Sequence, residues 1–319
     1  MSSVKGKKIA KRVVGLVVLL FLVMNIIAFF HAYKFTHFTN ADVRKTKDAK
    51  HISFVGKIKA LFFGINNPRP TSITLPARSY QTIKLQSNKI IECWLVKTPS
   101  DSPKGTIILF HGYSACKSQM LDKAEEFINQ GYHAMLVDFM GSGGAEGNQT
   151  TIGYKEAEEV KTCFEYLQSK QEKHIFMFGT SMGAAAILKA ICDYNLNPSG
   201  IIIECPFGSM YKTTCARFTS LHVPAFPMAD LLVFWGGIQN GFPAFSHNPT
   251  EYAKKVSCPT LLLYGEKDEK VSKEEIFEIY TNLRGNKQLR TYLLAAHENY
   301  LHKYKKEWRR DVTTFLSHL

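Results

Sequence analysis

The sequence has no cysteine pattern that would indicate a metal site or a disulfide framework. Its seven cysteines are scattered, no two of them form a CxxC pair, and none has a histidine partner at ligand spacing. We expect no metal and no cofactor. Most of these cysteines are interpreted as small core residues.

Acidic residues are nearly absent from the first 60 positions, which hold 12 Lys and Arg but only two acids, Asp42 and Asp48. Residues 61–319 carry 28 basic and 25 acidic residues and are close to neutral. The formal net charge of +13 therefore belongs to one end of the chain. Because the body has no basic excess, we expect no nucleic-acid partner.

Charged residues are also missing from Val13 to Phe30, an apolar run of 18 residues. As a helix rising ~1.5 Å per residue, the run spans about 27 Å, close to the hydrocarbon thickness of a bilayer. A core helix would show a polar stripe, and a cleaved signal peptide would be shorter and end in a small-x-small site. We predict an uncleaved signal anchor at 13–30 that contacts membrane lipids.

Basic residues directly precede this run, and the positive-inside rule makes residues 1–12 a cytoplasmic tail with the body outside. Basic residues on the other flank (Lys34, Arg44, Lys45, Lys47 and Lys50) and an odd number of thiols count against that orientation. Residues 31–79 are interpreted as a juxtamembrane linker. Within it, 51–63 either lies on the membrane surface or packs on the body.

The body, 80–319, alternates short apolar runs with longer amphipathic stretches, which predicts a mostly parallel sheet of about eight strands with helices on both faces. The chain is long enough to bury a sizeable core, since 45% of its 319 residues are hydrophobic. The expected strands are 80–86 and 90–97, which form a hairpin, then 106–110, 134–137, 175–178, 201–203, 260–264 and 289–294. Helices are expected at 117–130, 153–169, 182–193, 272–283 and 299–317.

One segment, about 207–247, breaks the alternation and is rich in Phe, Pro, Gly and Met. It falls between the sixth and seventh expected strands, so it is interpreted as an insertion over one end of the sheet. Insertions of this kind commonly cap active sites, and the alternative is a structural cover for an apolar surface.

The strongest chemical signal is Gly179-Thr180-Ser181-Met182-Gly183, which lies between an expected strand and an expected helix. A serine at such a sharp turn is lifted above the carboxyl edge of the sheet, and glycines on both sides let strand and helix pass each other. Serine is a weak nucleophile and needs a base. Ser181 is therefore the candidate nucleophile.

Two residues fall where such a fold would deliver the base and the acid. Asp268 follows the 260–264 strand, and His297 follows the last strand. The carboxyl ends of parallel strands meet at one edge, so we expect Asp268 and His297 beside Ser181. Glu266 and Glu269 are alternatives for the acid, and His302 is the alternative for the base.

A tetrahedral intermediate also needs two hydrogen-bond donors for its oxyanion. One candidate is the backbone N–H of Met182, directly after the serine. The other is the backbone N–H of Tyr113 in the His111-Gly112-Tyr113 sequence that follows the 106–110 strand. His111 is expected to order this loop rather than act as a base.

These motifs, with DFMGSGG at 138–144 and GEKD at 265–268, resemble α/β-hydrolases of the serine-hydrolase superfamily, near monoacylglycerol lipases, lysophospholipases and serine aminopeptidase-like proteins. The resemblance covers about 80–319 and implies an α/β-hydrolase fold with a cap after the sixth strand and a Ser181, His297, Asp268 triad. One departure is Met140, where many relatives carry Arg. Residues 1–79 lie outside the resemblance.

A dinucleotide site is the first competing prediction, because GSGGAEG at 141–147 follows a strand, but the third glycine of the fingerprint would be Glu146. A non-catalytic protein on this fold would be expected to lose a triad member. The apolar cap and the anchor favour an esterase or lysophospholipase that acts on small-molecule or lipid esters. A peptidase and an acyltransferase stay open as alternatives, as does the oligomeric state.

Overall fold

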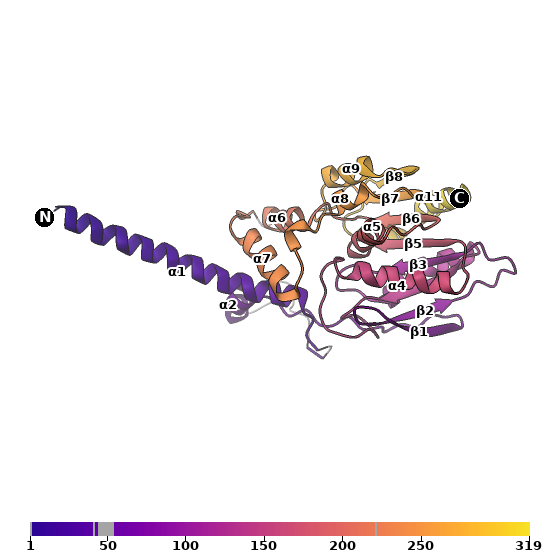
Figure 1. The fold of residues 1–319 in the computed structure, drawn as a ribbon, viewed down its shortest axis with the longest axis horizontal. Coiled ribbons are helices and arrows are strands. Elements are labelled where there is room, and N and C mark those ends of the chain that lie inside the picture. Colours follow the sequence, from indigo (N-terminus) through magenta and orange to yellow (C-terminus); the bar gives the residue numbers. More distant parts are fainter. Residues whose placement is uncertain (1, 41, 44–53, 221) are drawn as a thin grey trace.

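The computed structural model describes residues 2–40, 42–43, 54–220 and 222–319. At its centre is one eight-stranded sheet in the order β1-β2-β4-β3-β5-β6-β7-β8 (Figure 1). All strands from β3 to β8 run parallel, and the β1–β2 hairpin is antiparallel. The strands are β1 (Tyr80–Gln86), β2 (Ile90–Val96), β3 (Thr106–Phe110), β4 (His133–Asp138), β5 (Ile175–Thr180), β6 (Gly200–Glu204), β7 (Thr260–Gly265) and β8 (Lys287–Tyr292).

The central strands are apolar along their whole length because both faces of the sheet are covered. In β3, Ile108 and Phe110 face one hydrophobic cluster, whereas Ile107 and Leu109 face another. The first cluster includes side chains of α4 (Glu156–Ser169), α5 (Met182–Tyr194) and α9 (Lys273–Asn282). The second includes those of α3 (Leu121–Asn129) and α11 (Lys305–Ser317). The predicted fold class, a mostly parallel sheet with helices on both faces, is confirmed.

Two expected helices differ from the structure near their ends. The helix expected at 117–130 begins as a 3-10 helix (Lys117–Met120), where the Lys117 ammonium turns inward to the carboxylates of Asp138 and Glu92. The last expected helix is divided into α10 (Tyr300–Lys303) and α11, because Tyr304 leaves the helical conformation and its hydroxyl accepts a hydrogen bond from the Leu294 N–H.

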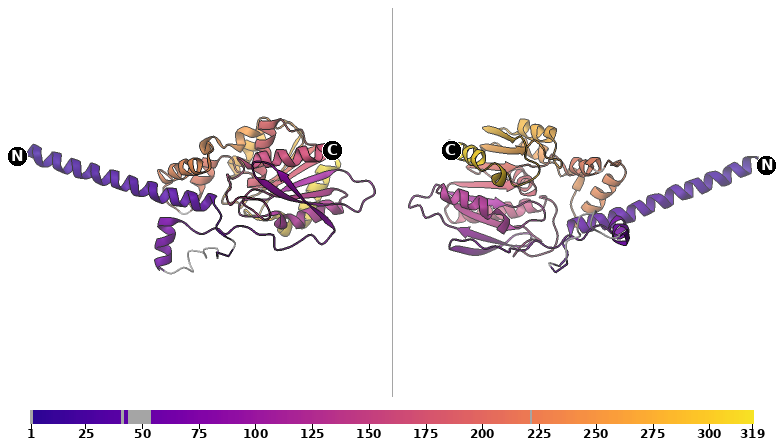
Figure 2. Two further views of the ribbon diagram at one scale, coloured as in Figure 1. Left: turned by 60° about the horizontal axis from the view of Figure 1, so that its bottom comes forward. Right: turned by 180° about the vertical axis from the view of Figure 1, so that it is seen from behind.

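The insertion after β6 is helical. It holds α6 (Met210–Ser220), α7 (Met228–Asn240) and a 3-10 helix (Ala244–Ser246), and the short α8 (Pro249–Ala253) then leads into β7. In Figures 1 and 2, α6 and α7 lie between the sheet and the long N-terminal helix. We call α6 and α7 with their connection the cap.

The N-terminal helix α1 (Ser2–Thr36) extends past the apolar run at both ends, and the Lys and Arg residues before the run are good helix formers. Its first half projects from the body, and its second half packs against α7 and against α2 (Phe54–Phe63) (Figures 1 and 2). Within the described ranges, α1 is the one helix long and apolar enough to cross a membrane. Positions 44–53, with four of the flanking basic residues, lie outside the described residues.

Candidate active site

Ser181 stands at the turn between β5 and α5 in a strained backbone conformation. Its φ is +52°, a value that residues other than glycine rarely adopt. Its N–H donates to the Glu204 carbonyl at 2.8 Å. A Cβ on Gly179 would lie 2.7 Å from the Ala184 nitrogen, and one on Gly183 would lie 2.4 Å from the Phe110 carbonyl oxygen. Both glycines are therefore required for β5 and α5 to approach this closely.

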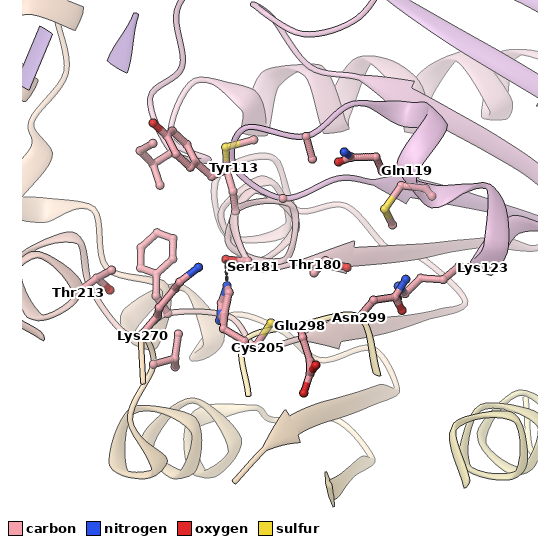
Figure 3. A pocket seen from close by; sticks show the side chains of 18 of the residues that line it. Tyr113, Gln119, Lys123, Thr180, Ser181, Cys205, Thr213, Lys270, Glu298 and Asn299 are labelled. Atoms are coloured by element: carbon pink, nitrogen blue, oxygen red, sulfur yellow. Dashed lines mark hydrogen bonds between the residues drawn. The ribbon is translucent and has the colours of Figure 1, made fainter. Parts of the chain in front are cut away.

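The structure brings Ser181, His297 and Asp268 together from the ends of three strands, β5, β8 and β7. The Ser181 Oγ lies 3.1 Å from the His297 Nε2, the contact drawn as a dashed line at Ser181 in Figure 3. The His297 Nδ1 lies 2.7 Å from the Asp268 Oδ2. The Asp268 side chain is fully buried, and its other oxygen accepts from the N–H groups of Lys270 and Val271. Asp268 is thus fixed to orient the imidazole.

The alternatives weighed from the sequence do not join this arrangement. Glu266 and Glu269 are exposed, and the side chain of His302 is 74% exposed and lies 3.1 Å from the Asp122 carboxylate. Only Asp268, among these candidate acids, contacts His297 in the described part of the chain.

Cys205 also contacts this group, and the sequence analysis did not single it out. It directly follows β6, is buried, and has a φ of +41°. Burial lowers the pKa of the His297 imidazole, but the neighbouring Cys205 and Asp268 outweigh burial and raise that pKa to about 10. Cys205, Asp268 and His297 are also the one group of three side chains in the described ranges that could hold a metal ion, with donor atoms within 4.8 Å of one another.

The His111-Gly112-Tyr113 loop lies against Ser181. A Cβ on Gly112 would be 3.4 Å from the Thr180 carbonyl oxygen and 3.7 Å from the Ser181 Cβ. The buried His111 ring is bonded at both nitrogens: Nδ1 donates to the Gly112 carbonyl and Nε2 accepts from the Phe139 N–H. Burial lowers the pKa of His111, which keeps the ring neutral. His111 is therefore a part of the loop's framework.

Tyr113 and Met182, whose backbone N–H groups are the expected oxyanion donors, line the same cavity as Ser181. Within the described residues, neither of these two N–H groups donates to a protein acceptor. Two free donors beside a serine hydroxyl are what an oxyanion would need.

The side chain of Tyr113 is held by residues that precede the body. Its hydroxyl donates to the Phe35 carbonyl at 2.7 Å and accepts from the Asn67 Nδ2 at 2.6 Å. Its ring stacks on the Phe35 ring, with centroids 4.5 Å apart. Nothing in the local sequence indicates these contacts, because Phe35 and Asn67 lie outside the motifs that identify the fold.

A second loop beside the site is also held from outside the body. Met140, the position at which the sequence departs from the family pattern, is buried. The Arg69 guanidinium donates to backbone carbonyls of the 141–147 loop, among them Ala145 and Gly147. Residues 66–70, expected to be part of a linker, therefore contact two loops at this edge of the sheet.

Ser181 opens into a cavity of about 630 Å³ (Figure 3). Apolar side chains form much of its wall, including those of Met120, Ile152, Phe207 and Val271. Three cationic side chains also line it: Lys123 from α3, which pairs with Glu204, Arg217 from α6, and Lys270 from the loop after β7. The cavity combines room for an apolar chain with positive charge.

Comparisons with known proteins identify the family and the fold. A model of the serine aminopeptidase S33 family matches residues 101–254. The chain is 24% identical over 225 residues to YqkD of Bacillus subtilis, a match that covers 69% of this chain and 73% of that uncharacterized protein. It is 22% identical over 214 residues to lysophosphatidylserine lipase ABHD12 of Macaca fascicularis, a match that covers 64% of this chain and 52% of the lipase.

The chain thus spans about half the length of that lipase. Among solved structures, an esterase of Pyrococcus furiosus, Pf2001, superposes with a TM-score of 0.64 at 22% identity, covering 79% of this chain and 98% of that one. A ferulic acid-bound Est1E from Butyrivibrio proteoclasticus superposes with a TM-score of 0.57 at 14% identity, covering 74% and 99%. Together with the fold, these matches place the chain in the α/β-hydrolase superfamily, among its serine hydrolases.

Proposed function

We propose that this protein hydrolyses carboxylic esters of apolar acyl chains at a membrane surface, with Ser181 as nucleophile, His297 as base and Asp268 as the group that orients the base. The observation that carries the proposal is the hydrogen-bonded chain from Ser181 through His297 to Asp268, which opens into a largely apolar cavity.

The reaction would proceed by acyl transfer. His297 takes the Ser181 proton as Oγ attacks the ester carbonyl, and the N–H groups of Met182 and Tyr113 bind the oxyanion. The protonated His297 then gives its proton to the departing alcohol. Water, deprotonated by His297, releases the acid from the acyl-enzyme.

Charge in the cavity favours an ester whose alcohol part carries an anion, such as a lysophospholipid. Arg217 and Lys270 line the cavity. Its acidic side chains already have partners: Asp122 accepts from Asn299, and Glu298 pairs with Lys303. A matching relative, the lysophosphatidylserine lipase, acts on a lipid of this class by its name.

A peptidase is the second candidate, because the matching family model describes a serine aminopeptidase. Such an enzyme needs an acidic group to hold the substrate amine. Glu204 is fully buried and bonded to Trp308 and Thr180, and Asp230 lies near the Tyr211 hydroxyl; neither lines the cavity. These contacts favour the esterase.

The anchor part of the proposal is that the apolar run of α1 spans the bilayer once, with residues 1–12 in the cytoplasm and the catalytic domain outside. The run is exposed and has a mean hydropathy of 3.0 over its most apolar window. A C-terminal reporter that is active only in the cytoplasm tests the orientation. Activity of that reporter would reverse it.

A fluorophosphonate probe tests the nucleophile. We expect the full chain in detergent to be labelled and Ser181→Ala to be unlabelled. The matched control is Ser118→Ala, which removes another cavity serine and should be labelled like the wild type. Equal labelling of Ser181→Ala and the wild type would remove Ser181 from the mechanism.

A substrate panel tests the reaction class. It compares p-nitrophenyl esters of rising chain length with aminoacyl-nitroanilides on the full chain, because residues 35 and 67 contact the site. Ester turnover that increases with acyl length is expected. Turnover of the anilides alone would replace the esterase with the peptidase.

A further inference from the structure

The anchor helix and the cap are joined by direct contacts. The Trp235 Nε1 of α7 donates to the Asn25 Oδ1 of α1 at 3.2 Å, and the Trp235 ring packs edge-on against the Phe29 ring with centroids 5.2 Å apart. The Gln239 side chain donates to the Phe29 carbonyl at 2.9 Å. Figures 1 and 2 show α7 lying along the second half of α1.

Helix α2 contacts the same end of the anchor. The Phe63 ring packs edge-on against the Phe30 ring with centroids 5.4 Å apart, and the His31 Nε2 lies 2.8 Å from the Leu61 carbonyl oxygen. Two helices therefore pack on the end of the anchor: α7 of the cap, and α2 of the segment between the anchor and the body.

The position of these contacts along α1 sets their depth. Asn25 and Phe30 are about 7.5 Å apart along the helix axis, and Phe30 ends the apolar run. If 13–30 spans the hydrocarbon, Trp235 lies below the headgroups, level with the upper acyl chains. Tryptophan is enriched at this depth because its ring is apolar and its N–H is polar.

Large apolar side chains around these contacts are exposed. They are Phe29, Phe30, Ile58, Leu61, Phe62, Phe63, Val223, Phe226, Phe234 and Ile238. Phe226 is 77% exposed and Ile238 61%. The surface of a water-soluble protein rarely collects so many. Two members of this set, Phe29 and Phe30, belong to the apolar run of α1, and the others lie on or next to α2 and α7, which pack against that helix.

We propose that this set, which we call the interfacial surface, is immersed in the lipid bilayer around the anchor. The proposal rests on the anchor described under Proposed function and goes beyond it, because it assigns the cap itself to the membrane. The occupant is lipid, since the interfacial surface is continuous with the span of α1. Two lysines are compatible with this immersion, because a lysine can extend its ammonium group to the headgroups. They are Lys34, which donates to Asn66, and the exposed Lys59.

The consequence for the site concerns how substrate arrives. Helix α6 packs on α7 and supplies Thr213 and Arg217 to the cavity wall, and the Arg217 guanidinium lies 4.3 Å from the centre of the Phe35 ring. The cavity wall is therefore one helix away from the interfacial surface. In the proposed arrangement, the substrate cavity lies close to the bilayer in which a lipid ester is dissolved.

Tryptophan fluorescence tests the immersion directly. The chain has three tryptophans; Trp94 and Trp308 are buried in the body, and Trp235 lies on α7. The full chain is reconstituted in phosphatidylcholine vesicles whose acyl chains are brominated near the headgroup or near the methyl end. We expect the headgroup-side bromines to quench up to about one third of the emission and the methyl-end bromines to quench less.

Trp235→Phe keeps an aromatic ring against Phe29 and is expected to remove the quenching. If the wild-type chain resists carbonate extraction but its emission is not quenched, the proposed interfacial surface is wrong and the proposed anchor is still supported. If carbonate extracts the chain from the vesicles, both the anchor and the interfacial surface are wrong. Unquenched emission with chemical cross-linking between copies through α7 would assign the face to a second copy instead, and would also overturn the proposal.

A charge on the interfacial surface provides a functional readout. Ile238→Asp should lower turnover of a lipid ester in vesicles about tenfold and leave turnover of a water-soluble short-chain ester unchanged. The matched control is Leu319→Asp, the same change at an exposed residue at the opposite end of the molecule (Figure 1). Equal loss on both substrates, or equal loss in the control, would overturn the proposal.

Discussion

The Tyr113 hydroxyl donates a 2.7 Å hydrogen bond to the Phe35 carbonyl at the end of the anchor helix. The same hydroxyl accepts from Asn67, so one side chain ties the loop beside Ser181 to two segments that precede the body. If the Tyr113 N–H binds the oxyanion, these segments set its position. The anchor is then a structural part of the active site as well as an attachment to the membrane.

Tyr113→Phe tests this role because it removes both hydrogen bonds and keeps the ring and the backbone N–H. We expect kcat to fall by roughly 10- to 100-fold with little change in KM, since a donor displaced by a fraction of an ångström stabilises the transition state less. Asn67→Ala should have a similar but smaller effect. The double variant should be less impaired than the product of the two, because both changes act through one hydroxyl.

Tyr280→Phe is the matched control, because it also removes a tyrosine hydroxyl that donates to a carbonyl, that of Lys287, away from the site. It should leave kcat unchanged. A Tyr113→Phe variant with wild-type kcat, or one in which only KM rises, would show that the Phe35 and Asn67 contacts do not position the donor.

The pH dependence of kcat/KM follows from the raised pKa of His297. The imidazole accepts the Ser181 proton only when it is neutral, so activity increases with pH through that pKa. We expect the acid limb to lie above the ordinary value of 6.5, toward about 10. Cys205→Ser should move the limb to lower pH, because Cys205 is one of the two groups that raise the pKa.

Cys258→Ser, at a buried cysteine that is not among the groups shifting the His297 pKa, should leave the limb in place. Profiles measured with a short-chain ester check both variants. A wild-type limb at or below 6.5 would show that neither neighbour favours the imidazolium.

Two glycines in helices should respond to alanine in opposite ways. A Cβ at Gly183 would lie 2.4 Å from the Phe110 carbonyl oxygen, so Gly183→Ala should destabilise the protein by about 1–3 kcal/mol and move Ser181. At Gly236 no atom lies within 4 Å of the added Cβ, and Gly236→Ala should stabilise by up to about 1 kcal/mol through helix propensity.

Thermal unfolding of the two variants in the same detergent measures both effects, and fluorophosphonate labelling reports on the serine. Equal melting temperatures for the two variants would mean that α5 can shift away from β3 without cost, contrary to the packing seen here.

The cations of the cavity should select for anionic esters. Lys270→Gln should raise KM for a lysophosphatidylserine about tenfold, because a charge-assisted hydrogen bond is lost, and leave KM for an uncharged monoacylglycerol unchanged. Lys212→Gln is the control, since Lys212 lies on α6 but pairs with Glu278 outside the cavity. An equal rise in KM for both lipids would assign Lys270 a structural role.

The body was predictable because its strands are continuous apolar runs and its chemical residues stand directly after them. Ser181 is marked by its glycines, and Asp268 and His297 by their places after the last two strands. Such signals are local, and parallel topology converts them into proximity. The insertion after β6 was marked differently, by a composition that breaks the alternation of strands and helices.

Contacts between distant segments could not be predicted in this way. Asn67 and Arg69 belong to the segment that the sequence predicts to be a linker. Each nevertheless holds a loop, at 113 and at 141–147, through a single polar side chain, and such isolated contacts leave no periodic pattern in the sequence. Cys205 carries no motif, and its role depends on where β6 ends. The break at Tyr304 results from a tertiary hydrogen bond that helix propensity does not contain.

The central claim is that Ser181 forms the acyl-enzyme. The most direct measurement follows p-nitrophenol release from a long-chain p-nitrophenyl ester and analyses the enzyme, quenched during turnover, by mass spectrometry. The account predicts a burst of p-nitrophenol equal to the enzyme concentration and an acyl group on the peptide that contains Ser181. Ester hydrolysis that continues at the wild-type rate in Ser181→Ala, with no acylated peptide in the wild type, would contradict it.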